Sequence, residues 1–118
     1  MNWKTYEDIA TKYFHYFNNQ DLESLSSLFD ENITLKDWLS EYNGKQQVID
    51  AASTAFSTLQ KIQIKVKNIY EMSLTGVACE IDIHVVDNES ASLLEVVDVI
   101  DINNEGKITE IRAYILNP

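Results

Sequence analysis

The 118-residue sequence contains one cysteine, one proline and three glycines. A single cysteine, Cys79, excludes a disulfide within the chain and gives no sign of an oxidising compartment. The proline, Pro118, is the last residue, and residues that interrupt helices and strands are otherwise scarce. Because there is also no repeat, low-complexity tract or linker, we expect regular structure through a single domain over residues 1–118.

Long apolar runs are also missing. No stretch approaches the ~20 apolar residues that a membrane-spanning helix needs. Residues 1–20, MNWKTYEDIATKYFHYFNNQ, contain no uninterrupted apolar segment of the kind found in a secretory signal. These absences predict a protein that does not bind membranes and that is cytoplasmic.

Basic residues are few, with 9 Lys and Arg against 19 Asp and Glu and a formal net charge of −10 at pH 7. Such a chain repels phosphate backbones and anionic lipids, and its basic residues are scattered rather than clustered. We therefore exclude nucleic acid as a partner. The two histidines, His15 and His84, do not have the spacing of metal ligands, so we expect no metal site.

The first half of the sequence has the three- and four-residue apolar spacing of helices. One apolar stripe comprises Tyr6, Ile9, Ala10, Tyr13, Phe14 and Phe17, and residues 18–20 interrupt it. Asp21 is placed to cap a short second helix. A strand is predicted over residues 32–38, a loop over 40–44 and a third helix over 45–59.

The second half alternates apolar and polar residues, which is typical of strands. Four strands are predicted, over residues 61–72, 76–87, 92–102 and 107–116. Their connections are short enough for antiparallel hairpins. Helices followed by a curved antiparallel sheet predict an α+β fold in which the sheet wraps around the helices and leaves a conical pocket.

The segment LLEVVDVIDI, residues 93–102, places a carboxylate among aliphatic side chains. Alternate strand residues share a face, so Asp98 lies on the same face as Leu94, Val96, Ile100 and Ile102. An isolated buried charge is costly enough that it normally takes up a proton or finds a partner. Asp98 is therefore predicted to be neutral, paired or directed into a cavity.

The opposite face of this strand carries Leu93, Val97 and Val99 and is also apolar. An apolar patch on the outer face of a sheet predicts a partner sheet, most simply in a symmetric homodimer. The alternative is that the strand has a different register.

Two other polar side chains also lie on apolar faces. Tyr13 is on the stripe of the first helix, and Asp37 shares a strand face with Ile33 and Leu35. Each has an ordinary explanation: a buried tyrosine packs, Asp37 can cap the following loop, and Asp98 can accept hydrogen bonds from a turn. Because three such groups come from three different elements, we predict that they form one site.

Two segments resemble the nuclear transport factor 2-like superfamily, which includes SnoaL-like polyketide cyclases and ketosteroid isomerases. They are YFHYFNNQDLESLSSLFDENITLKDW, residues 13–38, and VVDVIDINNEGKITEIRAYI, residues 96–115. The resemblance spans nearly the whole chain and implies the cone-shaped, cystatin-like fold, with three N-terminal helices packed on a curved antiparallel sheet.

The resemblance also implies roles for the three polar residues. Tyr13 corresponds to the oxyanion-hole tyrosine of the isomerases, Asp37 to their general base, and Asp98 to their protonated second donor. It implies a cofactor-free isomerase or cyclase that acts on a small apolar carbonyl compound through an enolate. The alternative is a non-catalytic ligand-binding or dimerisation module. The isomerases carry a supporting tyrosine on the third helix, where this chain reads IDAAST, residues 49–54.

Overall fold

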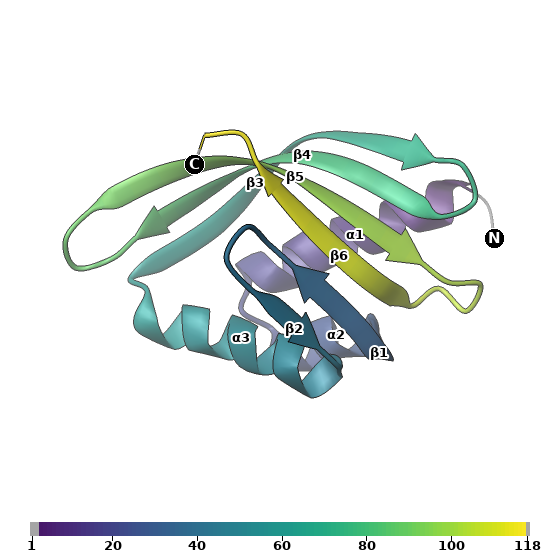
Figure 1. The fold of residues 1–118 in the computed structure, drawn as a ribbon, viewed down its shortest axis with the longest axis horizontal. Helices are drawn as coiled ribbons and strands as arrows, with labels where there is room; N and C mark the ends of the chain where they lie inside the picture. Colours follow the sequence, from purple (N-terminus) through teal and green to yellow (C-terminus); the bar gives the residue numbers. More distant parts are fainter. Residues whose placement is uncertain (1–2, 118) are drawn as a thin grey trace.

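The structure is a computed structural model that describes the backbone of residues 3–117 and the side chains of residues 6–117. Three helices and six strands follow one another along the chain (Figure 1). In order they are α1 (Trp3–Asn18), α2 (Leu22–Ser27), β1 (Phe29–Lys36), β2 (Glu41–Asn43), α3 (Lys45–Thr58), β3 (Lys61–Met72), β4 (Gly76–Val86), β5 (Ala91–Ile102) and β6 (Ile108–Ile115).

The strands form one curved sheet in the order β2-β1-β6-β5-β4-β3. The predicted antiparallel pairing is confirmed for β3 to β6, whose connections are hairpins. It is wrong at one position, because β1 runs parallel to β6. The partner of β1 comes from the far end of the chain, so no local pattern fixes the relative direction of the two strands.

Two boundaries in the first half differ from the prediction. β1 begins at Phe29 rather than at residue 32, and Phe29 pairs with Ile108 of β6. The expected loop over residues 40–44 contains β2, which pairs with β1. The three helices are therefore not one N-terminal block, since β1 and β2 separate α2 from α3.

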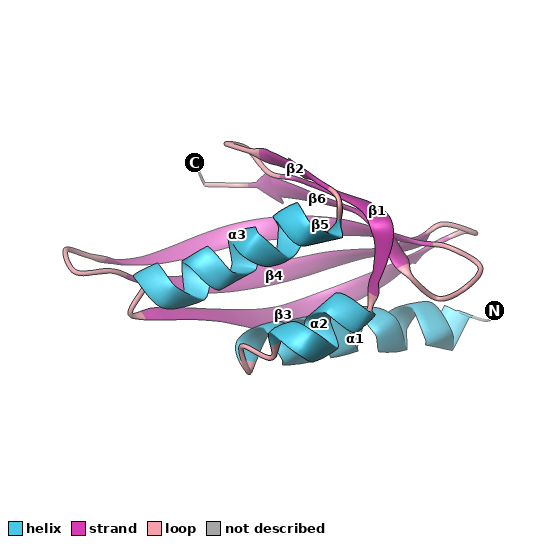
Figure 2. Ribbon diagram, turned by 90° about the horizontal axis from the view of Figure 1, so that it is seen from below, coloured by secondary structure: helices cyan, strands magenta, loops and turns pink. Residues whose placement is uncertain are grey.

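All three helices cover the same face of the sheet (Figure 2). The predicted stripe of α1 faces the sheet, and Ala10, Tyr13 and Phe14 on it are buried. The strands contribute the inner residues of each alternating pattern, including Ile33, Val77, Cys79, Ile81, Val96, Ile100 and Ile111. The core therefore lies between this face and the helices, as the sequence pattern predicts.

The side chain of Asn18 fastens the end of α1 to β3. Its Nδ2 donates to the Ile64 carbonyl at 2.7 Å, and its Oδ1 accepts from the Ile64 N–H at 2.7 Å. The Gln63 side chain donates in turn to the Asn18 carbonyl. These two hydrogen bonds to the Ile64 backbone resemble those between paired strands. They hold the end of α1 against the sheet and so help to position Tyr13, which lies on the same helix.

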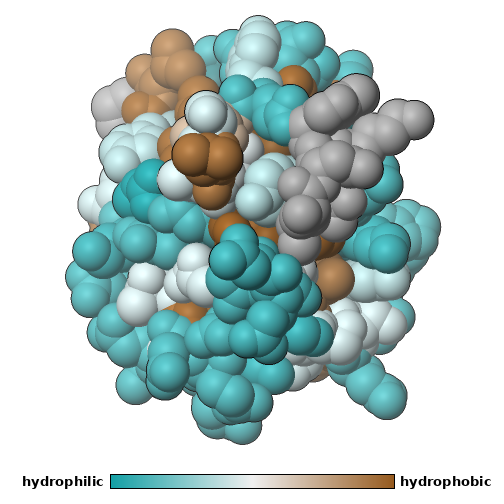
Figure 3. Space-filling view, turned by 90° about the vertical axis from the view of Figure 1, so that its right-hand side faces the viewer, coloured by the Kyte–Doolittle hydropathy of each residue, from teal (hydrophilic) through white to brown (hydrophobic). Residues whose placement is uncertain are grey.

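The surface is polar over much of the molecule. In the end view of Figure 3, hydrophilic side chains predominate and apolar groups are separated from one another. The outer sheet face is different, because Tyr70, Leu93 and Tyr114 are 53%, 44% and 55% exposed there. In the part of the chain that the structure describes, no helix is long and apolar enough to cross a membrane.

Candidate active site

Asp98 lies on the inner face of β5, as predicted, and is 6% exposed. Its cross-strand neighbours are Cys79 on β4 and Ala113 on β6. Both neighbours are small, so they leave room around the carboxyl group. Burial raises the pKa of Asp98 to about 7, because the charged form loses its solvation. Near neutral pH a large share of Asp98 is therefore the protonated acid, which can donate a hydrogen bond.

Tyr13 approaches the same region from α1 and is 5% exposed. Its ring packs against Phe14, Phe17 and Phe29 at centroid distances of 5.1, 6.4 and 6.1 Å. Burial, and then the charges of Asp98 and Cys79, raise the pKa of Tyr13 well above its usual range. The hydroxyl therefore remains protonated and is available as a donor.

Neither the Tyr13 hydroxyl nor the Asp98 carboxyl has a hydrogen-bond partner among the described residues. Among the described residues, Asp82 Oδ1 is the one fully enclosed side-chain oxygen without a hydrogen bond, so the oxygens of Tyr13 and Asp98 are accessible from the cavity. Two unpartnered groups on one cavity therefore indicate a place for a polar ligand atom.

Asp37 follows the last residue of β1 and forms a tight turn. Its Oδ1 accepts hydrogen bonds from the backbone N–H groups of Leu39 at 2.8 Å and Ser40 at 2.7 Å. Its own N–H donates to the Ser40 carbonyl at 2.9 Å. The loop-capping explanation is thus correct, but it uses only Oδ1. Asp37 also lines the cavity that Tyr13 and Asp98 share.

One cavity of about 160 Å³ brings the three predicted residues together. Its other walls are Phe17, Leu35, Trp38, Ile64, Ile83, Ile111 and Ala113. The sequence placed Phe17 and Leu35 on inward-facing apolar positions but assigned none of these seven residues to a site. The cavity combines apolar walls with three polar groups, which is typical of a small-molecule site.

A second cavity of about 230 Å³ adjoins the first beneath α3. Tyr13, Phe17, Leu35 and Asp37 line both cavities. The small side chains of α3 at residues 51, 52 and 55 form its far wall. Together the two cavities offer more space than the polar cavity alone.

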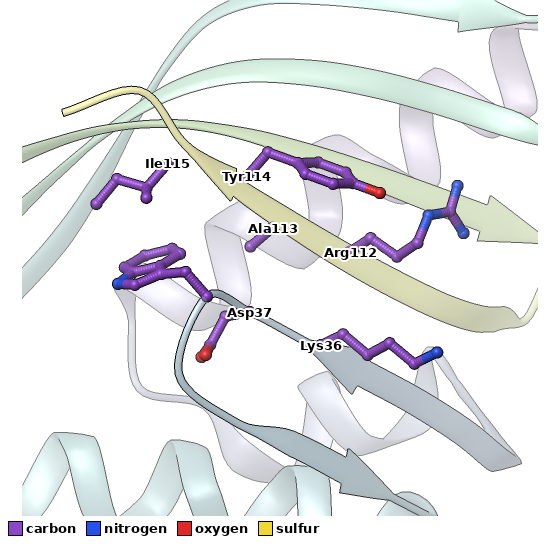
Figure 4. A pocket seen from close by; sticks show the side chains of 7 residues that line it. Lys36, Asp37, Arg112, Ala113, Tyr114 and Ile115 are labelled. Atoms are coloured by element: carbon purple, nitrogen blue, oxygen red, sulfur yellow. The ribbon is translucent and has the colours of Figure 1, made fainter. Parts of the chain in front are cut away.

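A third hollow, of about 410 Å³, opens beside β6 (Figure 4). β1 ends at Lys36, whereas β6 continues to Ile115, so the sheet has a notch at this point. Figure 4 shows Asp37 directed away from Tyr114 across this notch. Asp37, Trp38 and Ala113 line both the hollow and the polar cavity, which indicates a route from the surface.

Other polar residues lie apart from the cavity. His15 and His84 are exposed. Arg112 pairs across the strands with Asp101 at 2.9 Å. Cys79 is fully buried, and burial raises the pKa of its thiol to about 12, so the group is unreactive. Within the described residues, no three His, Cys, Asp or Glu side chains are grouped as metal ligands would be.

Comparison with solved structures shows the same fold in proteins of low sequence identity. An LEH-like epoxide hydrolase of Mycobacterium tuberculosis superposes with a TM-score of 0.85 at 13% identity, over 96% of this chain and 84% of that one. A Catenulispora acidiphila protein with a ketosteroid isomerase-like fold, solved with trimethylamine, gives 0.80 at 14% identity, over 90% and 83% of the two chains.

The Mycobacterium tuberculosis protein RV0760c in complex with estradiol-17beta-hemisuccinate gives a TM-score of 0.83 at 16% identity, over 92% of each chain. No curated protein is similar enough in sequence to count as a relative. The family of SnoaL-like domains matches residues 10–111, which confirms the resemblance drawn from the sequence. The chain therefore belongs to the SnoaL-like domain family.

Proposed function

We propose that the protein binds a small, largely apolar carbonyl compound and acts on it as a cofactor-free acid–base catalyst. The observation that carries this proposal is that two buried residues, Tyr13 and Asp98, line one largely apolar cavity without hydrogen bonds to other described side chains or backbone groups. Two donors on the same cavity suit an oxygen on which negative charge develops. The solved complex of RV0760c with an estradiol derivative supports ligand binding by this fold.

In the proposed reaction, Asp37 removes a proton from the carbon next to the carbonyl group. The electron pair of that C–H bond forms a carbon–carbon double bond, and the carbonyl π electrons move onto oxygen. Tyr13 and Asp98 donate hydrogen bonds to this enolate oxygen. Asp37 then returns the proton, either to the same carbon or to another carbon of the conjugated system.

The geometry at Asp37 fits the role of base. Its Oδ1 is held by the Leu39 and Ser40 N–H groups, which orients the carboxylate. Its Oδ2 has no hydrogen-bond partner within the described chain, and the residue lines the polar cavity. One oxygen therefore positions the group while the other is available for proton transfer.

A second candidate function is a non-catalytic ligand-binding or dimerisation module. The same turn at Asp37 favours it, because a carboxylate that caps a loop has a structural role without any reaction. We further propose that the exposed outer face around Leu93, Val97 and Tyr114 forms a symmetric homodimer.

Deuterium exchange separates the two functions without knowledge of the natural substrate. Small cyclic ketones and enones are incubated in D2O, and deuterium entering the carbon next to the carbonyl is followed by NMR. The enzyme proposal predicts exchange above background that falls by about 10²–10⁴-fold in Asp37→Asn.

Asparagine at position 37 keeps a carbonyl oxygen that can accept from Leu39 and Ser40, so the turn is retained. Asp30→Asn, at an acidic residue of β1 that does not line the cavity, is the control and should leave exchange unchanged. Ketone binding without exchange in the wild-type protein would support the non-catalytic module instead.

A further inference from the structure

The cavity beneath α3 shares Tyr13 and Asp37 with the polar cavity, but the proton transfer described above uses none of its other residues. It holds about 230 Å³ and is larger than the polar cavity that contains Asp98. Of its lining residues in the described chain, Asp37 alone carries a charge. A space of this kind adjoining a reacting centre calls for an apolar occupant.

The space exists because one face of α3 carries very small side chains. Ala51, Ala52 and Ala55 line the cavity from the helix, one turn beyond the buried Val48. Larger side chains at these positions would extend into the space, because neighbouring turns of a helix present residues i and i+4 on the same side. The opposing wall is formed by Leu25 and Phe29.

The two cavities meet at Tyr13. Tyr13, Phe17 and Leu35 line both spaces, whereas Asp98 lines only the polar cavity. A ligand whose oxygen is bound by Tyr13 and Asp98 therefore has its remaining atoms directed along Leu35 toward the alanines of α3. Figure 2 shows α3 lying across this face of the sheet.

We propose that this apolar cavity binds the body of the substrate, and that Ala51, Ala52 and Ala55 set the length of substrate the protein accepts. The inference rests on the proposed function and specifies its substrate class: an elongated molecule with a carbonyl group at one end and an alkyl chain or carbocycle at the other. At the ~30 Å³ that a water-sized group occupies in a liquid, a cavity of about 230 Å³ has room for roughly seven carbon-sized groups.

A series of 4-alkylphenols tests this assignment, since a phenol resembles an enol and the alkyl chain probes the second cavity. Calorimetric affinity is measured from phenol to 4-octylphenol. For the wild-type protein we expect about a fourfold gain for each added methylene group until the cavity is full, and then a plateau. Measured relative to its own affinity for phenol, Ala52→Leu should reach its plateau several methylene groups earlier.

Ala91→Leu makes the same change at an exposed position at the start of β5 and should reproduce the wild-type series. Ala55→Val, a smaller filling change, should give an intermediate plateau and provides a second test if Ala52→Leu does not fold. Identical chain-length series in the wild type and both cavity variants would overturn the inference.

The outcomes also separate the inference from the proposed function. If chain length governs affinity through residues 52 and 55 but no ketone exchanges deuterium, the apolar cavity is correctly assigned and the enzyme proposal fails. If ketones exchange deuterium but affinity does not depend on chain length, the reaction stands and the inference fails.

Discussion

Asp98 imposes a pH dependence on stability. In the folded protein its pKa is about 7, against 3.8 for an unperturbed aspartate. Between these values the folded state binds more protons than the unfolded state, so the free energy of unfolding falls as pH rises and is level above about pH 7. At ~1.4 kcal/mol for each pKa unit, the loss amounts to about 4 kcal/mol.

Asp98→Asn should remove this decline. We expect the variant to lose less stability than the wild type between about pH 4.5 and pH 7.5, as measured by urea unfolding across that range. Asp87→Asn is the control, because hydrogen bonds from the Glu89 and Ser90 N–H groups lower the pKa of Asp87 below 3.8. Its contribution to stability therefore changes only below this pH range, and the variant should keep the wild-type decline. Equal slopes for Asp98→Asn and the wild type would show that Asp98 is ionised in the folded protein.

At the residue scale, the sequence predicted the direction in which the candidate site residues face. The facing of Tyr13 and Asp98 follows from strand and helix periodicity, and both residues line the predicted pocket. The turn at Asp37 also follows from residue type. The sequence could not predict that the Tyr13 hydroxyl and the Asp98 carboxyl have no hydrogen-bond partner within the described residues. This depends on the space that the small neighbours Cys79 and Ala113 leave around Asp98.

At the scale of elements, Gly76 determines how closely β4 can approach β5. A Cβ at this position would lie 1.9 Å from the carbonyl oxygen of Ile100, which is a backbone atom. Gly76→Ala must therefore move one strand, and we expect it to lower the free energy of unfolding by more than about 2 kcal/mol in urea.

Gly44→Ala is the matched control. Gly44 has a φ of +90°, but the nearest atom to an added Cβ, the Glu31 carbonyl oxygen, is 3.9 Å away. The substitution costs only backbone strain, about 1–2 kcal/mol. If Gly76→Ala proves no more destabilising than Gly44→Ala, the close contact between β4 and β5 is not rigid.

Elements with long periodic patterns were predicted well, and short elements were not. The third helix and the four long strands have bounds within one residue of the prediction, because each contains several repeats of its pattern. β2 has only 3 residues and no alternation that could reveal it. In the sequence, Phe29 continues the apolar spacing of α2. In the structure it begins β1 and pairs with Ile108 of β6, so a tertiary contact overrides the local helical pattern.

At the scale of the whole molecule, the outer sheet face predicts association. Leu93 and Tyr114 are 44% and 55% exposed on the face opposite Asp98. We expect sedimentation velocity at micromolar concentration to show a dimer for the wild type and a monomer for Leu93→Glu, since a charge at the centre of an apolar interface is left unpaired.

Leu74→Glu provides the control for this experiment. Leu74 is 88% exposed and follows β3 in the turn before β4, away from the outer face. The variant should remain dimeric. A wild-type protein that sediments as a monomer at all concentrations, or a Leu93→Glu dimer, would contradict the proposed interface.

The α+β class was also predictable at this scale, because helical and alternating periods occupy separate regions of the chain. The parallel pairing of β1 with β6 and the notch that follows Lys36 were not. Both depend on how two segments about 75 residues apart in sequence come together, as the pairing of Lys36 with Arg112 shows, and a local pattern does not contain that information.

The most direct test of the central claim is a titration of the Asp98 carboxyl carbon by NMR, with and without a saturating 4-alkylphenol. We predict that Asp98 titrates near pH 7 in the free protein, and that its resonance shifts when the phenol binds at pH 6. An Asp98 that titrates near the ~3.9 of a free aspartate, with no response to the phenol, would contradict an acid that donates hydrogen bonds in this cavity.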